Sequence, residues 1–79
     1  MKRYVMHLVH RKTDDRWHLE HNGRSIAGFD SKAAASEAGQ ARGRALSESH
    51  QDAQLVIHLQ DGSIEKEYTY GHDPEQHPG

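Results

Sequence analysis

Two dipeptides that favour tight β-turns, Asn22-Gly23 and Asp61-Gly62, most constrain what this chain can fold into. Both residues of such a pair tolerate the positive φ that a two-residue type I′ turn requires, and each pair stands between strand-like segments. Consecutive acids within residues 13–16 indicate a third turn. We therefore expect three antiparallel strands at the N-terminus and one further hairpin near the C-terminus.

The predicted strands differ in their patterns of apolar residues. Residues 4–12 carry apolar side chains on both faces, which predicts a strand inside the sheet. Residues 17–21 alternate, so one face of that strand meets water, and residues 25–29 form a short strand that Gly28 weakens or bulges. Residues 55–59 are the most apolar run and predict a central strand, whereas residues 64–70 alternate and predict a peripheral one.

An alanine-rich segment from Lys32 to about Ser49 predicts the one helix, with Ser31 as its N-cap. Gly39 and Gly43 lie inside it, either as tolerated interruptions or as points of close packing. Four alanines recur at helical spacing, and we expect this stripe to face the sheet. They are Ala34, Ala38, Ala41 and Ala45.

The elements together predict the order βββαββ, an α+β fold with an antiparallel sheet of about five strands and one helix on one face. Residues 1–71 form the single domain, and residues 72–79 form a C-terminal tail. A sheet of five strands is roughly 20 Å wide, whereas a helix is about 10 Å across, so part of the sheet stays uncovered. Sheet curvature, the tail or a second copy of the chain must cover the remainder.

Length and composition exclude several classes of function. Seventy-nine residues without cysteine leave no disulfide, no thiolate metal site and no thiol nucleophile. No serine stands in a Gly-x-Ser-x-Gly motif and no glycine-rich phosphate loop is present, so we expect neither an enzyme nor a bound cofactor. The absence of an apolar run near 18 residues predicts a soluble cytoplasmic protein without a membrane partner.

Eight histidines raise the question of a metal site. If Thr13 pairs with Arg16, His10 and His21 become diagonal neighbours on one face, which makes them the weak candidates for two ligands. Structural sites need four ligands and catalytic sites three, so specific metal binding is disfavoured. His58 lies among aliphatic residues and is expected to be a buried, hydrogen-bonded core histidine. A buried neutral histidine would lower stability below about pH 6.

The charge is unevenly distributed along the chain. The formal net charge is −2, which disfavours obligate binding to a phosphate backbone. Residues 1–44, however, hold nine Lys/Arg against five Asp/Glu, a net of +4, whereas the remainder has a net of −6. A basic surface that includes Trp17 or Tyr4 could contact nucleic acid. The basic residues considered for this role are Arg11, Lys12, Arg16, Arg42 and Arg44.

An ordered set of short segments resembles the small bacterial family catalogued as domain of unknown function 2188. The resemblance extends over residues 4–74 and implies a compact bacterial domain with no assigned catalytic residues. Its segments are Trp17-His18-Leu19, Phe29-Asp30-Ser31-Lys32 before Ala34 and Ala35, Leu55-Val56-Ile57-His58 with Asp61-Gly62, and Tyr70-Gly71-His72-Asp73-Pro74.

The function expected from the sequence is that of a non-enzymatic protein-interaction module. It would act through the uncovered sheet face or an edge strand, and its partners would be another protein and itself, as a homodimer. A weak nucleic-acid-binding protein that uses the basic N-terminal half is the first alternative. A histidine-based metal-binding protein is the second.

Overall fold

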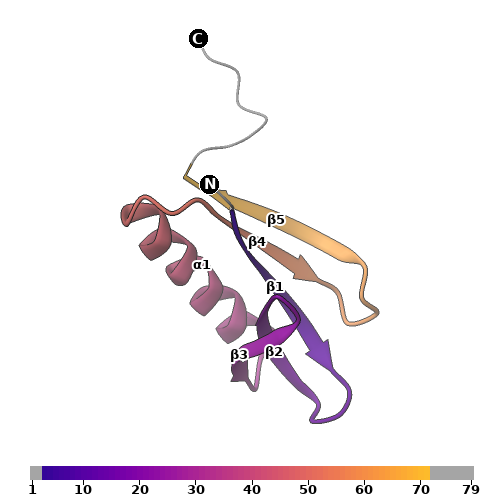
Figure 1. Ribbon diagram of the computed structural model, residues 1–79. Helices are drawn as coiled ribbons and strands as arrows, with labels where there is room; N and C mark the ends of the chain where they lie inside the picture. Colours follow the sequence, from indigo (N-terminus) through magenta and orange to yellow (C-terminus); the bar gives the residue numbers. More distant parts are fainter. Residues whose placement is uncertain (1–2, 72–79) are drawn as a thin grey trace.

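Three strands, one helix and two strands follow one another along residues 3–71, the part of the chain that the computed structural model describes (Figure 1). The predicted α+β class and the order βββαββ are confirmed. The elements are β1 (Tyr4–Arg11), β2 (Arg16–His21), β3 (Arg24–Phe29), α1 (Lys32–Glu48), β4 (Ala53–His58) and β5 (Ile64–Tyr70). The expected tail, residues 72–79, lies outside the described residues.

The five strands form one sheet in the order β3-β2-β1-β4-β5. Three of the neighbouring pairs are antiparallel, but β1 and β4 run parallel, which makes the sheet mixed. The parallel pair arises because α1 carries the chain back across the sheet between β3 and β4. The sequence expectations that β1 lies inside the sheet, that β4 is central and that β5 is peripheral are confirmed.

The two hairpins predicted from turn dipeptides differ in their turns. Asn22 and Gly23 both take positive φ, 53° and 80°, as a type I′ turn requires. In the second hairpin only Gly62 has positive φ, so the type I′ prediction is wrong there. The Asp61 carboxylate accepts hydrogen bonds from the amide and the hydroxyl of Ser63, at 2.9 and 2.7 Å, and these hold a wider loop.

The first hairpin also turns over more residues than the sequence suggests. Arg11, not Thr13, pairs with Arg16, and four residues form the loop. The Arg16 amide donates to the Asp14 carboxylate at 3.1 Å, and Asp15 takes a φ of 56°. The predicted register is therefore wrong by two residues, because these local contacts favour a longer turn.

The helix begins as predicted but packs through a different face. The Ser31 hydroxyl accepts from the Ala34 amide at 3.1 Å and caps the helix. Ala35, Gly39 and Gly43 are the buried residues of α1. The predicted alanine stripe is wrong: Ala34, Ala41 and Ala45 are exposed, and Ala38 is only partly buried.

Close approach between α1 and the sheet explains this change of face. A Cβ atom on Gly39 would lie 3.0 Å from the methyl groups of Leu55, and one on Gly43 would collide with the ring of Tyr70. A Cβ on Gly43 would therefore displace the Tyr70 ring, and one on Gly39 would press on the leucine methyl groups, so the glycines mark the packed face and the alanines turn outward.

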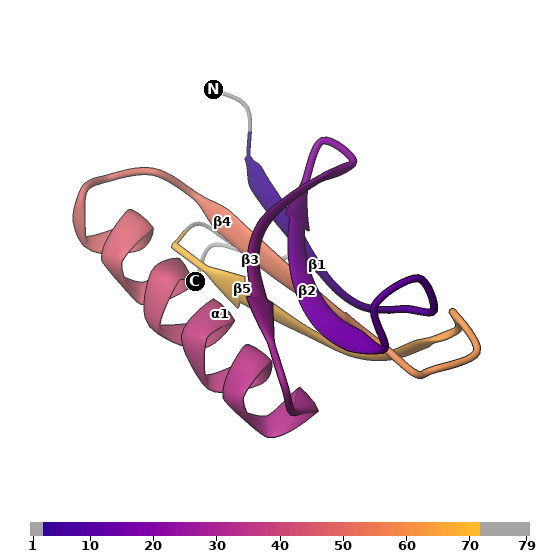
Figure 2. The same ribbon diagram turned by 90° about the horizontal axis from the view of Figure 1, so that it is seen from below.

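The hydrophobic core lies between α1 and the sheet face that it covers. Its buried residues are Met6, Leu8, Leu19, Ala35, Leu55 and Ile57. Partly buried aromatic residues pack around them, namely Tyr4, Trp17, Phe29, Tyr68 and Tyr70. The opposite sheet face has no helix over it (Figure 2). None of the helical segments in residues 3–71 is long and apolar enough to cross a membrane.

Candidate functional site

The sheet face that α1 leaves uncovered, here called the open face, carries the side chains that alternate with the core residues of β1, β2, β4 and β5. Most of them are polar, and Val5, Val9 and Val56 lie among them. Many of these side chains bind one another. The Arg11 guanidinium donates twice to one Glu20 carboxylate oxygen, at 2.9 and 2.6 Å. The Gln54 amide donates to the Glu67 carboxylate at 2.6 Å. This internal pairing satisfies the polar groups of these four side chains.

A histidine pair lies at the centre of the open face. His7 Nδ1 and His58 Nε2 are 2.8 Å apart, and His58 Nδ1 is 3.0 Å from the Gly62 carbonyl oxygen. The carbonyl can only accept, so His58 Nδ1 carries a hydrogen and its neutral Nε2 accepts from His7. Burial, together with the charge of a protonated His58, lowers the pKa of His7, although Glu20 and Glu67 oppose this.

The prediction that His58 is a buried core histidine is wrong. Its side chain is only partly buried and lies on the open face. The reason is the alternation of β4, because Leu55 and Ile57 point into the core and the residues between and after them point away. The buried histidine is instead His18, which is 7% exposed.

His18 lies between a serine and a carboxylate. Its Nε2 is 2.7 Å from Asp14 Oδ2, and its Nδ1 is 2.7 Å from Ser25 Oγ. The carboxylate can only accept, so Nε2 carries a hydrogen and donates to Asp14. Nδ1 contacts the Ser25 hydroxyl, which also donates to the Ala27 carbonyl at 3.4 Å. Gly28 makes room, since a Cβ there would lie 3.3 Å from the His18 ring. Serine, histidine and carboxylate thus adjoin in the order found in covalent hydrolases, but the two ring nitrogens are exchanged, since in those enzymes Nε2 faces the serine and Nδ1 faces the carboxylate.

The three groups of this constellation come from the β1–β2 loop, β2 and β3. The constellation could not be predicted from the sequence, because no spacing rule connects Ser25 to Asp14 and His18. The only local signal is that Asp14 and His18 are four residues apart at the end of a hairpin. Neither of the two cavities described below is lined by any of the three residues. The contacts tie the β1–β2 loop to β3.

The carboxylate of this constellation is stabilised in its charged form. Desolvation opposes ionisation of Asp14, but hydrogen bonds from His18 and from the Arg16 amide, with the nearby positive charges, lower its pKa overall. The carboxylate thus remains an acceptor for both residues at neutral pH.

The structure separates the two candidate metal ligands. His10 pairs with Trp17, and His21 lies four residues further along β2, roughly 13 Å away in an extended strand. His10 Nε2 is 2.9 Å from the Asp15 carboxylate, while the His21 ring stacks on Tyr4 with centroids 3.8 Å apart. Across residues 3–71 no three histidine, aspartate or glutamate side chains are grouped to hold a metal ion.

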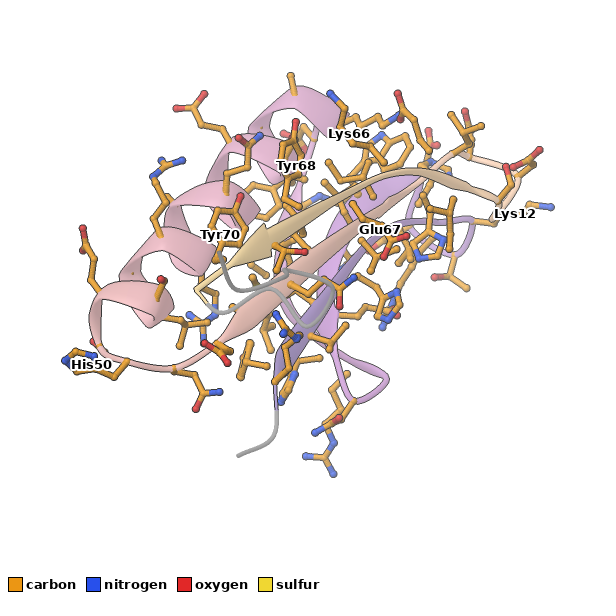
Figure 3. All side chains as sticks on the ribbon, turned by 90° about the horizontal axis from the view of Figure 1, so that it is seen from above. Lys12, His50, Lys66, Glu67, Tyr68 and Tyr70 are labelled. Atoms are coloured by element: carbon orange, nitrogen blue, oxygen red, sulfur yellow. The ribbon has the colours of Figure 1, made fainter. Side chains whose placement is uncertain are left out.

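The five basic residues considered for nucleic acid fall into two separate groups. Arg11 binds Glu20, and Arg16 Nε binds the Asp30 carboxylate at 3.1 Å. Lys12 lies in the adjoining loop at the far end of the sheet from His50 (Figure 3). The other two lie on α1: Arg42 donates to the Tyr4 hydroxyl at 3.2 Å, and Arg44 is exposed. The structure does not bring the five into one continuous surface.

Two hollows adjoin the sheet. The larger, here called the α1–β5 groove, has a volume of about 410 Å³, and the Lys32–Glu65 ion pair lies on its wall. The groove is lined by Lys32, Ala33, Ser36, Ile57, Glu65, Lys66 and Tyr68. The smaller, here called the Tyr4 pocket, has a volume of about 290 Å³. It is lined by Arg3, Tyr4, His21, Asn22 and Gln51.

The groove borders β5, the edge strand with the longer run of paired residues. The Tyr4 amide donates to the Asp52 carbonyl at 2.8 Å, which fixes the alternation of backbone hydrogen bonds along β4. The backbone groups of its even-numbered residues bond to β1, and those of its odd-numbered residues bond to β5. Odd-numbered residues of β4 oppose even-numbered residues of β5. The backbone N–H and C=O groups of Glu67 and Thr69 therefore point away from the sheet, at an open edge.

A mixed five-stranded sheet with one helix, two open edges and shallow hollows defines a small α+β domain whose accessible features are edges and grooves. The sequence profile of the uncharacterized proteins conserved in bacteria known as domain of unknown function 2188 matches residues 6–70, and the chain belongs to this family. The resemblance noted in the sequence is thereby confirmed. No curated protein and no solved structure is significantly similar to the chain.

Proposed function

We propose that this protein is a non-enzymatic protein-interaction module that self-associates by pairing β5 with β5 of a second copy. The observation that carries the proposal is the open edge of β5, where the backbone groups of Glu67 and Thr69 point outward. An added strand would satisfy these groups and extend the sheet, which is a common way for edge strands to bind a partner. The association would take place in the cytoplasm.

A two-fold axis limits the possible registers. The residues whose backbone groups point outward must face one another in the two copies of β5. Because these are alternate residues, the two-fold axis passes through a residue position rather than between two residues. An axis at Lys66 places two lysines opposite each other, and an axis at Glu67 places two glutamates opposite each other. Like charges in these positions are destabilising. An axis at Tyr68 is the register that avoids them while still pairing five residues of each strand.

The Tyr68 register also brings complementary side chains together. Lys66 of one copy opposes Tyr70 of the other, and Glu67 opposes Thr69. Lys66, Tyr68 and Tyr70 lie on the α1 side of β5, whereas Glu67 lies on the other side (Figure 3). Lys66 Nζ already lies 5.3 Å from the Tyr68 ring centroid, and the second copy would add a further aromatic ring beside it. The partner strand would run along the α1–β5 groove.

The association is tested by sedimentation equilibrium of the full chain between about 10 µM and 1 mM. The interface is smaller than a standard protein–protein interface, so we expect a weak, concentration-dependent dimer. Thr69→Pro removes an outward N–H that the monomer does not use and should give a monomer with an unchanged circular dichroism spectrum. Thr69→Val keeps the N–H and is the matched control. A wild type that stays monomeric at 1 mM, or a proline variant that dimerises equally well, contradicts the proposal.

The register is tested by single cysteines, because the natural chain has none. A residue on the two-fold axis faces its own copy at a distance that a disulfide can span. Tyr68→Cys should therefore form a disulfide-linked dimer under mild oxidation, whereas Glu67→Cys should not. Efficient cross-linking through Glu67→Cys with none through Tyr68→Cys would refute this register.

A further inference from the structure

The Tyr4 pocket is lined by residues from the start of β1, from the β2–β3 hairpin and by Gln51. Figure 2 shows the start of β1 and the β2–β3 hairpin at the same end of the sheet. Side chains and backbone groups hold its walls in place. His21 Nδ1 donates to the Val5 carbonyl at 3.1 Å, and the Asn22 amide is 3.2 Å from His21 Nε2. The Gln51 amide donates to the Asp52 carbonyl at 3.0 Å. The pocket is therefore built from groups whose orientations are fixed before any ligand enters.

An aromatic stack forms one wall of the Tyr4 pocket. The rings of Tyr4 and His21 are nearly parallel, with an interplanar angle of 10° and centroids 3.8 Å apart. The Arg42 guanidinium lies 5.5 Å from the Tyr4 ring centroid and donates to its hydroxyl. Stacked aromatic and guanidinium groups of this kind offer a flat surface to a planar ligand.

Two arginines adjoin the pocket. Arg3 lines it, and Arg42 lies on Tyr4. None of the five lining residues is a carboxylate. The nearest acidic residue along the chain is Asp52, next to Gln51. Arginine guanidinium and side-chain amide groups are the donors that proteins commonly place around phosphate.

We propose that the Tyr4 pocket binds a mononucleotide, with its phosphate at the arginines and its base against the Tyr4–His21 stack. The pocket has room for more than a phosphate alone. About 290 Å³ exceeds what one phosphate group fills, since a water molecule occupies roughly 30 Å³ in the liquid. It is just below the usual range for sites that hold small organic ligands. The site is separate from the open edge of β5, and its occupancy does not depend on self-association.

The proposal is tested by titrating the full ¹⁵N-labelled chain with adenosine monophosphate, adenosine and inorganic phosphate. Adenosine monophosphate should shift the amide resonances of Tyr4, His21 and Asn22. It should bind at least about tenfold more tightly than adenosine or phosphate, because neither fragment makes both contacts. Arg42→Gln should weaken binding by about tenfold or more, as expected for loss of a hydrogen bond to a charged group.

Arg44→Gln is the matched control, because it removes the same charge two residues further along α1 and should change the affinity less than about twofold. No amide shift with 10 mM adenosine monophosphate would overturn the proposal, and so would equal losses in the two variants. Saturation by a single-stranded oligonucleotide lacking a terminal phosphate, with adenosine monophosphate silent, would also overturn it, because the ligand would then be a nucleic acid.

Discussion

His7 gives the open face a pH-dependent component of stability. Its folded pKa lies below the ordinary value of 6.5, because burial and His58 outweigh Glu20 and Glu67. The unfolded chain therefore binds a proton first as the pH falls, and the free energy of unfolding should decrease from about pH 6.5 downward until the folded pKa is passed. Urea unfolding at pH 7.5, 6.5 and 5.5 measures this decrease.

The variant His7→Gln should unfold with a shallower pH dependence over the same interval, because it removes the titrating group. His50→Gln provides the comparison, since that exposed side chain lies at the end of α1, away from the open face (Figure 3). Equal slopes for wild type and His7→Gln would show that the pH dependence arises elsewhere.

His18 links the β1–β2 loop to β3 through its two ring nitrogens. His18→Ala leaves the Asp14 carboxylate and the Ser25 hydroxyl without their ring partner and should lower the free energy of unfolding by about 1–3 kcal/mol. Ser25→Ala should cost less, because Ser25 is exposed. Chemical denaturation gives both values. If wild type hydrolysed an activated ester faster than Ser25→Ala does, the constellation would be catalytic and the structural assignment would fail.

Gly43 in α1 is an exception to the usual destabilising effect of glycine in a helix. Replacing a helical glycine with alanine normally stabilises a helix by about 1 kcal/mol. Gly43→Ala should destabilise this protein instead, because the new Cβ would collide with Cδ2 and Cε2 of the Tyr70 ring. Its melting temperature should fall below that of wild type. The melting temperature of Ala41→Gly, at an exposed position, should fall by the ordinary propensity alone. A more stable Gly43→Ala would mean that α1 lies further from β5.

The C-terminus of α1 can be improved by one substitution. The His50 amide donates to the Ser47 carbonyl at 3.0 Å, and the Gln51 amide donates to the Leu46 carbonyl at 2.9 Å, which together form a Schellman motif. His50 occupies the position where glycine is preferred, with a φ of 64°. His50→Gly should raise the free energy of unfolding by about 1 kcal/mol, measured in urea. His50→Ala keeps the strain and should give no such gain.

The number and order of the elements could be predicted from turn dipeptides, strand alternation and an N-cap, because these signals are local. The face of α1 that packs on the sheet could not be predicted, since it depends on how closely the helix approaches Leu55 and Tyr70. The β1–β2 register failed for a related reason, as side-chain contacts of Asp14 and Asp15 select the loop. The parallel pairing of β1 with β4 is equally invisible in the patterns of the separate strands.

The candidate sites were less predictable than the fold, because each combines residues far apart in the chain. Tyr4, His21 and Gln51 meet at one pocket although no motif links them. The basic N-terminal half includes Arg11 and Arg16, whose guanidinium groups are engaged by acidic residues. A pattern of charge along a sequence does not show which cations are paired in the fold.

Self-association should be visible in the stability of the whole molecule. If two copies pair through β5 only when folded, the dimer stabilises the native state by mass action. At ten times the dissociation constant this amounts to about 1.4 kcal/mol. For a domain of this size, 1 kcal/mol shifts the melting temperature by about 4–8 °C, so the melting temperature should rise by roughly 5–10 °C from dilute to concentrated solution.

Thr69→Pro should melt at the same temperature at every protein concentration, because it cannot accept the second strand. A wild-type melting temperature independent of concentration, up to the highest concentration examined by sedimentation, would mean that β5 remains an unpaired edge.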